Sequence, residues 1–375
     1  MMAAMNEKII DLVAGARPNF VKLAPVVKAL RRDGQLVPRI VHTGQHYHEG
    51  LSDVFFAQLG IPSPDVHLEV GSGAHGVQTA RILERYEAHA MASRPAATVV
   101  FGDVNSTVAC GLAAVKLGVP VVHVEAGLRS FDRTMPEEIN RILTDALSEL
   151  LLVSEPSGLK HLEREGVPRD KVRLVGNTMI DTLLGYLPGA RARDRATELG
   201  LTKGGYGLLT LHRPSNVDEP EVLKRLIACF EALSAELPIV FPVHPRTRAA
   251  LERAGIAPSR KEAWRLIYLE PQGYLENLSL MTDAAVVLTD SGGMQEETAV
   301  LGVPCITLRE NTERPVTVEV GASRLVGNDS DRIRQAFEDV LRGAWPRAGE
   351  IPLWDGRAGE RIAAVLAEWL GAQRH

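Results

Sequence analysis

The sequence predicts an α/β protein made of two doubly wound, Rossmann-like halves. Short runs of apolar, often β-branched residues recur along the chain, and a longer stretch with helical periodicity follows each of them. This alternation pauses once, between residues 178 and 205, and then resumes. Polar side chains stand at the end of nearly every apolar run. Strands that alternate with helices form parallel sheets covered on both faces, and such sheets bind ligands at the carboxyl edge of their strands.

Six apolar runs precede the pause, and we interpret each as one strand. Their Val, Ile and Leu residues do not alternate strictly with polar ones, which is typical of strands buried on both faces. The runs are KIIDLVAG (8–15), PRIVHTG (38–44), ATVVFGD (97–103), VPVVHVEA (119–126), ELLLVSE (149–155) and VRLVGN (172–177).

The segment 178–205 contains a stretch rich in Gly, Arg and Lys and is the best candidate for a linker. At 375 residues the chain is also longer than one ordinary hydrophobic core supports. We therefore predict an N-terminal domain over residues 1–180 and a C-terminal domain over 181–356, with a final helix, 357–375, that packs back on the first domain. The second domain contains the runs YGLLTLH (206–212), LPIVFPVH (237–244), RLIYLE (265–270), AAVVLTD (284–290), VPCITL (303–308) and SRLVG (323–327).

Composition and charge argue against several classes of protein. Hydrophobic residues make up 45% of the chain and charged residues 24%, which is typical of a folded globular protein. The net charge of −5 disfavours a nucleic-acid binder, and no apolar run is long enough for a signal peptide or a membrane span. Cys110, Cys229 and Cys305 are odd in number and far apart, so a disulfide framework or zinc site is disfavoured and a reducing cytoplasm is expected.

The polar residues at the strand ends predict where a ligand binds. Parallel strands bring their carboxyl ends to one edge of a sheet, so residues that follow different strands meet there. We expect most of these residues to line one active site in the cleft between the two domains. They are Gly15-Ala16-Arg17, Asp103, Glu125, His212, His244, Gln272 and Asp290-Ser291.

The segment DSGGMQEE (290–297) is a candidate phosphate site. Ser291, Gly292 and Gly293 follow a predicted strand and open a helix, whose first N–H groups and dipole favour an anion. An ordinary turn with a serine N-cap explains the same residues. Glu297, expected at the end of the first helical turn, either complements the helix dipole or accepts hydrogen bonds from a diol such as ribose.

The segment GARPNFVK (15–22) places two cations just after the first strand. Pro18 is expected at the first position of a helix, and the guanidinium of Arg17 is suited to bind phosphate oxygens, with Lys22 close by. The alternative is a solvated helix start.

Three carboxylates are candidates for proton transfer. Asp103 and Glu125 close consecutive predicted strands, and Glu137 begins the helix PEEINRILTDALSELL (136–151). Carboxylates gathered at a strand edge raise one another's pKa through burial and repulsion, which yields groups that exchange protons near neutrality. We expect Glu137 to pair with Arg141, and Arg129, Arg133 and Glu138 to form a structural ion-pair network. The buried stripe of this helix is expected to be Ile139, Leu143, Ala146, Leu147 and Leu150.

Two further motifs are interpreted as loops without a cofactor. HTGQHYH (42–48) has three histidines, His42, His46 and His48, but no carboxylate or cysteine at ligand spacing, so a metal site is disfavoured. GSGAHG (71–76) matches G-x-G-x-x-G, yet the apolar run before it is short and comes third, and the next acid at a strand end is too distant. We therefore expect neither a metal nor NAD.

Together, these segments resemble the non-hydrolysing UDP-N-acetylglucosamine 2-epimerases, which have the two-domain glycosyltransferase-B fold. The resemblance covers nearly the whole chain in order, and its most specific parts are VEAGLRS with PEEINR and TDSGGMQEE with TERP. It also includes GARPNFVKLAPVV, HTGQH, FGDVNSTVACGLAA, LHRPSNVD, PVHP and PQGYLENL.

The resemblance implies a metal-free inversion at C2 of the sugar, from UDP-GlcNAc to UDP-ManNAc, by anti elimination of UDP to a 2-acetamidoglucal and re-addition. It assigns proton handling to Asp103, Glu125 and Glu137, with His212 beside the diphosphate, and it implies a homodimer. Glu297 would reach the ribose and Gln272 would lie beside uracil. The other positions that match substrate contacts are Arg17, Lys22, Arg141, His244, Ser291, Gly292, Gly293 and Arg314.

The chain departs from the family pattern at two positions. Asn19 stands where Glu is commoner, and Pro214 stands where an Arg is expected. That Arg helps bacterial members bind a second UDP-GlcNAc as activator, together with the loop of Gln45 and His46 and a position that matches His244, so the resemblance leaves substrate activation open. Four alternatives also stay open: a hydrolysing epimerase that releases ManNAc and UDP, an epimerase of a related UDP-2-acetamido sugar such as a diacetamido uronic acid, a glycosyltransferase, and a non-catalytic UDP-sugar binding protein.

Overall fold

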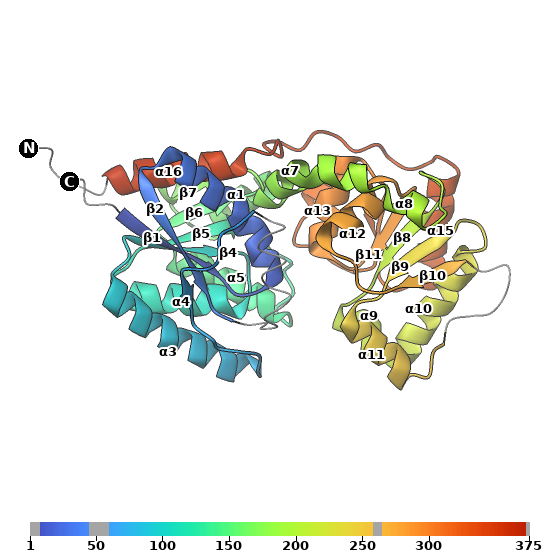
Figure 1. Ribbon diagram of the computed structural model, residues 1–375, viewed down its shortest axis with the longest axis horizontal. Helices are drawn as coiled ribbons and strands as arrows, with labels where there is room; N and C mark the ends of the chain where they lie inside the picture. Colours follow the sequence, from blue (N-terminus) through green and yellow to red (C-terminus); the bar gives the residue numbers. More distant parts are fainter. Residues whose placement is uncertain (1–7, 45–59, 258–264, 373–375) are drawn as a thin grey trace, which may run out of the picture. The chain divides into compact units, whose positions relative to one another are not determined.

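The computed structural model describes residues 8–44, 60–257 and 265–372, apart from the side chains of Arg17 and Pro18. The chain divides into two compact units, Met1–Thr182 with Pro352–His375 and Leu183–Ile351 (Figure 1). Each unit contains one parallel sheet, of seven strands in the first and six in the second. The predicted fold class, α/β with two doubly wound sheets, is therefore confirmed.

The sheet of the first unit has the strand order β3-β2-β1-β4-β5-β6-β7. All six runs predicted before the pause form strands, and the run before GSGAHG adds a short strand, β3, at the edge of the sheet. The bounds are β1 Lys8–Ala14, β2 Leu36–His42, β3 Val66–His67, β4 Ala97–Phe101, β5 Val121–Ala126, β6 Leu150–Val153 and β7 Val172–Leu174.

Helices cover both faces of this sheet (Figure 1). The last helix, α16, packs against α1, and Asp181 of α7 accepts hydrogen bonds from the backbone N–H groups of Ala358 and Gly359 at the start of α16. On the other face, α4 packs between α3 and α5. The bounds are α1 Arg17–Asp33, α3 His75–Ser93, α4 Asn105–Lys116, α5 Pro136–Leu147, α6 Pro156–Arg164, α7 Thr178–Arg193 and α16 Ala358–Ala372, with a 3₁₀ turn at Arg169–Lys171.

The sheet of the second unit has the strand order β10-β9-β8-β11-β12-β13, and all six runs predicted after the pause form its strands. The strands are β8 Gly207–Thr210, β9 Ile239–Pro242, β10 Leu266–Leu269, β11 Val286–Thr289, β12 Cys305–Thr307 and β13 Ser323–Leu325. The helices are α8 Arg195–Glu198, α9 Pro214–Val217, α10 Pro220–Leu233, α11 Pro245–Arg253, α12 Tyr274–Thr282, α13 Gly292–Leu301, α14 Val316–Glu319 and α15 Ser330–Leu341.

In each sheet, successive strands are added first on one side of the initial strand and then on its other side. The boundary between the two sides is the topological switch point, where doubly wound sheets bind ligands. The switch point lies between β1 and β4 in the first unit and between β8 and β11 in the second. Asp103 follows β4, His212 follows β8 and Ser291 follows β11. The topology therefore places predicted site residues beside each switch point.

The buried side of α5 differs from the prediction. The residues it buries are Glu138, Arg141, Thr144 and Asp145, whereas Leu143 is 48% exposed. The predicted stripe of Ile139, Leu143, Ala146, Leu147 and Leu150 is thus wrong, and Leu150 belongs to β6. The spacing of apolar residues predicted the wrong buried side because the polar side of α5 is buried against other charged groups, as described below.

No helix in the described part of the chain is both long and apolar enough to cross a membrane. Cys110, Cys229 and Cys305 are buried free thiols. The helix α1 begins at Arg17, so Pro18 occupies its second position rather than the predicted first.

Candidate active site

Glu125 lies near the end of β5 in a strained backbone conformation. Its φ angle is +75°, in the left-handed region that residues with a side chain rarely adopt. The register of β5 against β6 also shifts here, between Val124 and Ala126. Such strain costs about 1–3 kcal/mol and concentrates at functional sites. At Gly127, with φ +78°, a Cβ would lie only 2.6 Å from the carbonyl oxygen of Gly158, so the close approach requires glycine.

Two carboxylate–cation pairs meet at this edge of the first unit. Glu125, which is buried, forms an ion pair with Lys22 of α1, and Asp103 forms one with Arg141 of α5. A Cβ on Gly102 would lie 3.0 Å from Lys22 Nζ and 3.8 Å from Glu125 Oε2. Because Asp103 is the next residue in the chain, the two pairs are neighbours. The structure thus brings four of the predicted site residues together.

Glu137 is not the partner of Arg141, contrary to the prediction. Arg141 turns to the buried side of α5, where its Nη2 lies 2.9 Å from Glu138 Oε2 and its Nη1 contacts Asp103. Glu137 is half-buried in the first turn of α5, and none of the described residues forms a hydrogen bond or ion pair with its side chain. Its carboxylate therefore stays available near the positive end of the helix dipole.

The structural ion-pair network predicted for Arg129 and Glu138 is confirmed. Arg129 binds both carboxylate oxygens of Glu165, at 2.8 and 2.7 Å. Glu138 accepts the backbone N–H groups of Ser130 and Phe131, both at 2.9 Å. Burial alone would raise the pKa of Glu138, but the hydrogen bond from Ser130 and the charge of Arg141 lower it. Arg133, named with them, lies exposed at the surface.

A buried charge cluster lies under the carboxylate edge. Both ring nitrogens of His123 are bonded, Nδ1 to Asp145 at 2.6 Å and Nε2 to the carbonyl oxygen of Gly102 at 2.8 Å. Asp145 also accepts the N–H of Gly127 at 3.0 Å and pairs with Arg129 at 2.7 Å. Burial opposes ionisation of Asp145, but His123 and Arg129 lower its pKa. The cluster therefore fixes the glycines next to both carboxylates of the edge.

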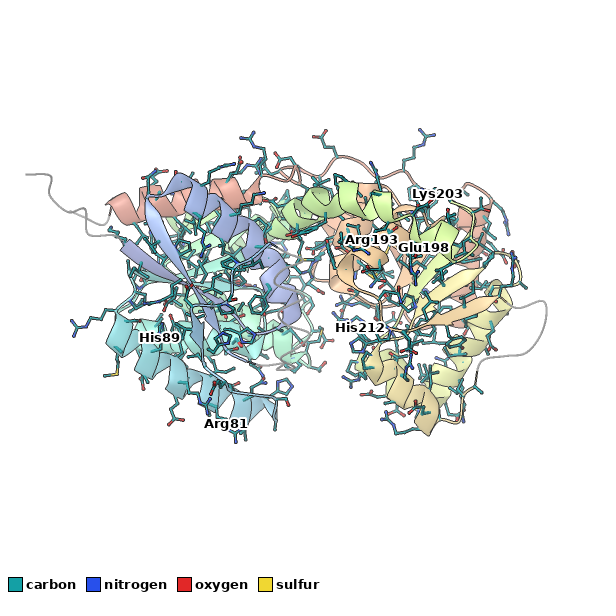
Figure 2. All side chains as sticks on the ribbon, in the orientation of Figure 1. Arg81, His89, Arg193, Glu198, Lys203 and His212 are labelled. Atoms are coloured by element: carbon teal, nitrogen blue, oxygen red, sulfur yellow. The ribbon has the colours of Figure 1, made fainter. Side chains whose placement is uncertain are left out.

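His212 is the predicted site residue that follows β8 in the second unit (Figure 2). Its side chain is 39% exposed, and its Nδ1 lies 2.9 Å from Oδ1 of Asp290, which is fully buried. No hydrogen bond from the described part of the chain reaches its Nε2. The ring therefore has one nitrogen held by the protein and one available to a ligand.

His244 lies next to His212, with ring centroids 5.5 Å apart. It caps α11, where its Nδ1 accepts the backbone N–H of Arg246 at 3.2 Å. Burial, and then the charge of His212, lower the pKa of His244. His244 is therefore neutral near pH 7.

The first turn of α13 forms the glycine-containing edge of the second unit. The helix begins at Gly292, and its N-cap, Ser291, forms no capping hydrogen bond through its side chain. A Cβ on Gly292 would lie 3.0 Å from Arg314 Nη1 and 2.8 Å from an oxygen of Glu313. The guanidinium of Arg314 thus lies beside the positive end of the helix dipole, an arrangement suited to an anion. Gly293 is the second residue of the same turn.

Buried acids hold Arg314 in this place. Arg314 is 5% exposed and forms ion pairs with Glu313 and with Glu296, the latter at 2.5 Å. Glu313 in turn pairs with Arg309 at 2.7 Å. A guanidinium fixed on two sides loses little conformational freedom when it binds a ligand.

Glu297 lies in the second turn of α13, not at the end of the first as predicted, because the helix begins at Gly292. Complementing the helix dipole is therefore a weak explanation for it, since that effect falls off within the first turn. The hydroxyl of Tyr274 donates to Glu297 at 2.9 Å. Burial and the nearby charge of Glu296 raise the pKa of Glu297 to about 7, against the opposing effect of Tyr274.

Gln272 lies in the loop before α12, where its Nε2 donates to the carbonyl oxygen of Glu270 at 2.7 Å. Among the described residues, no hydrogen bond links it to another predicted site residue. Arg17 is the first residue of α1, but its side chain lies outside the described part of the structure, as do Gln45, His46 and His48. The described residues contain no cluster of His, Cys, Asp and Glu that could hold a metal ion.

The contacts of three residues that lie at the two edges were not predicted from the sequence. Asp290 was expected at the edge, but its contact with His212 was not foreseen. Tyr274 carried no signal beyond its place after Gln272. Asn19, noted only as a departure, accepts the N–H of Ala16 at 3.0 Å and donates to the carbonyl oxygen of Phe101 at 2.9 Å. Asn19 therefore ties the start of α1 to the end of β4.

Comparison with known proteins identifies the family. A sequence model described as UDP-N-acetylglucosamine 2-epimerase matches residues 28–367. The chain is 42% identical over 362 residues to the UDP-N-acetylglucosamine 2-epimerase of Methanocaldococcus jannaschii, covering 95% of this chain and 98% of the relative. It is 40% identical over 365 residues to the UDP-2,3-diacetamido-2,3-dideoxy-D-glucuronate 2-epimerase of Pseudomonas aeruginosa, covering 96% and 99%.

A solved structure agrees with this. The crystal structure of the M. jannaschii enzyme in complex with UDP-GlcNAc and UDP superposes on this chain with a TM-score of 0.87, covering 96% of this chain and 99% of that one. The matches extend through both units and include the carboxylate edge of the first and the glycine-containing edge of the second. The chain belongs to the UDP-N-acetylglucosamine 2-epimerase family, whose named members are isomerases.

Proposed function

We propose that the protein interconverts UDP-GlcNAc and UDP-ManNAc without releasing the free sugar. The bond between C1 and the diphosphate oxygen breaks, UDP leaves with the electron pair, and C2 gives its proton to a carboxylate, so that a C1–C2 double bond forms. A proton then returns to C2 from the opposite face, and a diphosphate oxygen re-forms the bond to C1. The proton is removed and replaced within one cycle, so no redox cofactor is needed.

The first unit supplies the acid–base groups for this reaction. Asp103 and Glu125 are neighbours, each with a cationic partner, and Glu137 has none among the described residues. A reaction that inverts a carbon needs proton acceptors and donors on two faces, which more than one carboxylate provides. We assign Lys22 and Arg141 to positioning these acids and binding substrate.

The second unit supplies the binding groups for the nucleotide. The first turn of α13 with Arg314 suits the diphosphate, and Glu297 with Tyr274 suits a ribose diol. His212 presents its Nε2 for the same diphosphate. A pocket that stabilises departed UDP lowers the barrier to its loss and keeps it for return.

The observation that carries the proposal is the juxtaposition of Asp103 and Glu125 around Gly102, with strained backbone at Glu125. The test is incubation with UDP-GlcNAc in D₂O, followed at C1 and C2 of the sugar by NMR. We expect deuterium at C2 while UDP remains attached. Free ManNAc with UDP would instead establish a hydrolysing epimerase. An intact, unlabelled ligand that binds would overturn catalysis on this sugar.

A second substrate is favoured by one specific observation. The P. aeruginosa relative, named for a diacetamido uronic acid, is 40% identical to this chain, nearly as similar as the M. jannaschii relative at 42%. The same elimination serves any UDP-2-acetamido sugar, because it involves only C1 and C2. The D₂O experiment should therefore be run in parallel with UDP-2,3-diacetamido-2,3-dideoxy-D-glucuronate, and the sugar with the larger kcat/KM is the substrate.

A further inference from the structure

We propose that Asp290 is a positioning residue for His212. Its carboxylate accepts the Nδ1–H of the imidazole and so permits Nε2–H to donate to the diphosphate when the ring is doubly protonated. The inference rests on the proposed function, in which the second unit binds UDP. In this proposal Asp290 does not touch the substrate itself. It determines which nitrogen of the His212 ring faces the substrate and whether both ring nitrogens can carry hydrogen.

The position of Asp290 does not depend on the imidazole of His212. Its Oδ2 accepts three hydrogen bonds from other donors, the backbone N–H groups of His212 and Arg213 at 3.0 and 2.9 Å and the side-chain amide of Asn216 at 3.1 Å. Asn216 also donates to the carbonyl oxygen of Leu308 at 3.0 Å, which anchors it. The other oxygen, Oδ1, faces His212 Nδ1 at 2.9 Å and accepts a longer hydrogen bond from the backbone N–H of His212 at 3.2 Å. A fully buried carboxylate held in this way orients the ring, rather than the ring orienting the carboxylate.

The charged groups around His212 leave Asp290 as the anion that faces the ring. Burial would raise the pKa of Asp290, but the hydrogen bond and charge of His212 lower it, so Asp290 is the anion that faces Nδ1. His244 is neutral near pH 7, as described above. The nearby cations are occupied: Arg213 donates to the carbonyl oxygen of Asp290, and Arg246 forms an ion pair with Asp218.

Replacing Asp290 by Asn separates this role from a structural one. An Asn whose oxygen takes the place of Oδ2 keeps all three hydrogen bonds described above. Its NH₂ group then faces His212 Nδ1, where it can donate but not accept. Nδ1 must therefore be unprotonated, Nε2 carries the ring's one hydrogen, and double protonation would set two donors against each other. The substitution thus keeps the three hydrogen bonds to Oδ2, loses the longer one from the His212 backbone N–H to Oδ1, and reverses the bond to the ring.

The test measures UDP affinity by calorimetry from about pH 5.5 to about pH 8, the range in which imidazoles change charge. Four proteins are compared: wild type, Asp290→Asn, His212→Gln and the double variant. We expect Asp290→Asn to weaken UDP binding about tenfold at the acid end, the worth of one charge-assisted hydrogen bond. The difference should fade and then reverse as the pH rises, because the neutral wild-type ring has no hydrogen on Nε2 while the ring of the variant does. UDP and Glu297 titrate in the same way in all four proteins, so their effect on affinity cancels when the proteins are compared at one pH. In the His212→Gln background, Asp290→Asn should change nothing.

Two results overturn the inference: a loss of affinity for Asp290→Asn that is equal at all pH values, or a loss that adds fully to that of His212→Gln. Should Asp290→Asn not fold, ring ¹⁵N shifts of His212 in the wild type, assigned with His212→Gln, decide instead. A ring with hydrogen on Nε2 alone across this pH range would overturn the inference. Failure of the proposed function is distinguishable, because it shows as absent C2 exchange in the wild type whatever UDP binding does.

Discussion

The molecule contains two histidine–aspartate pairs that look alike as chemistry and differ in what surrounds them. His123 and Asp145 lie in the first unit, and the histidine is fully buried with both ring nitrogens bonded to the protein. His212 and Asp290 lie in the second unit, where the histidine side chain is 39% exposed and one ring nitrogen has no partner among the described residues. The difference follows from position along the strand, because His123 stands inside β5 and His212 stands beyond the end of β8.

The comparison shows that a buried aspartate beside a histidine can either stabilise the fold or orient the histidine toward a ligand. Where both ring nitrogens are bonded internally, the pair fixes backbone, here at Gly102 and Gly127 next to Asp103 and Glu125. Where one ring nitrogen is left at the sheet edge, the same pair is suited to meet a charged ligand. The first pair should therefore matter to stability and the second to binding.

The largest expected effect is a loss of C2 exchange from a change in the first unit that leaves UDP binding by the second unit nearly unchanged. Asp103→Asn removes one of the proposed acid–base groups, so we expect C2 deuterium exchange to fall about 10²–10⁴-fold. UDP affinity should stay within about tenfold, since the α13 edge is unchanged. NMR exchange and calorimetry measure the two quantities. Glu163→Gln, an exposed carboxylate of the same unit, is the control, and normal turnover by Asp103→Asn would refute the assignment.

The next effect contrasts the two pairs directly. Asp145→Asn removes the buried carboxylate that His123, Arg129 and the backbone N–H of Gly127 share, so we expect a loss of about 3–5 kcal/mol in the free energy of unfolding. His212→Gln alters a half-exposed residue, so its loss should stay below about 1 kcal/mol. Urea denaturation measures both. Equal losses would show that the two pairs do not differ in the way proposed.

Glu297 should make stability depend on pH in the opposite sense to Asp145 and Asp290. It is a buried acid without a cationic partner of its own in the described structure. Its pKa is raised from 4.5 to about 7, while those of Asp145 and Asp290 are lowered. The folded protein therefore holds a proton that the unfolded chain releases between these values. Stability should fall by up to about 3 kcal/mol as the pH rises from about 4.5 to about 7.

Glu297→Gln should abolish this dependence, and the check is denaturation of both proteins at several pH values. Asp145 and Asp290 act in the opposite sense, since their contribution is lost as the pH falls below the ordinary range of aspartate. A wild type and a Glu297→Gln variant with parallel pH profiles would show that Glu297 is ionised in the folded state throughout.

The smallest effect concerns the helix that carries Arg141. Because Leu143 is 48% exposed, Leu143→Ser should change the free energy of unfolding by no more than about 0.5 kcal/mol. Thermal or urea denaturation measures it. A loss of several kcal/mol would mean that another chain covers Leu143 in solution.

The fold class and the strands were largely predictable, and the contacts of the site were not. Apolar runs identified twelve of the thirteen described strands, all but the short edge strand β3, because buried parallel strands need continuous apolar sequence. Residues at strand ends indicated the edges, since topology brings those ends together. The same reasoning failed on α5, where the apolar period pointed to Leu143 while the buried side holds Glu138, Arg141 and Asp145. Hydrophobic periodicity cannot detect a helix side that is buried against partner charges.

The sequence by itself determined which residue types stand at the end of each strand, and with them the two edges and the family. Only the tertiary structure decided which of two histidines has a ring nitrogen without a partner in the described part of the chain. It also decided that Arg141 pairs with Asp103 and Glu138 rather than Glu137, and that Glu297 bonds Tyr274. The physical reason is that strand and helix periods are local, set by the backbone within a few residues. Charge pairing and burial depend on groups brought close from distant parts of the chain.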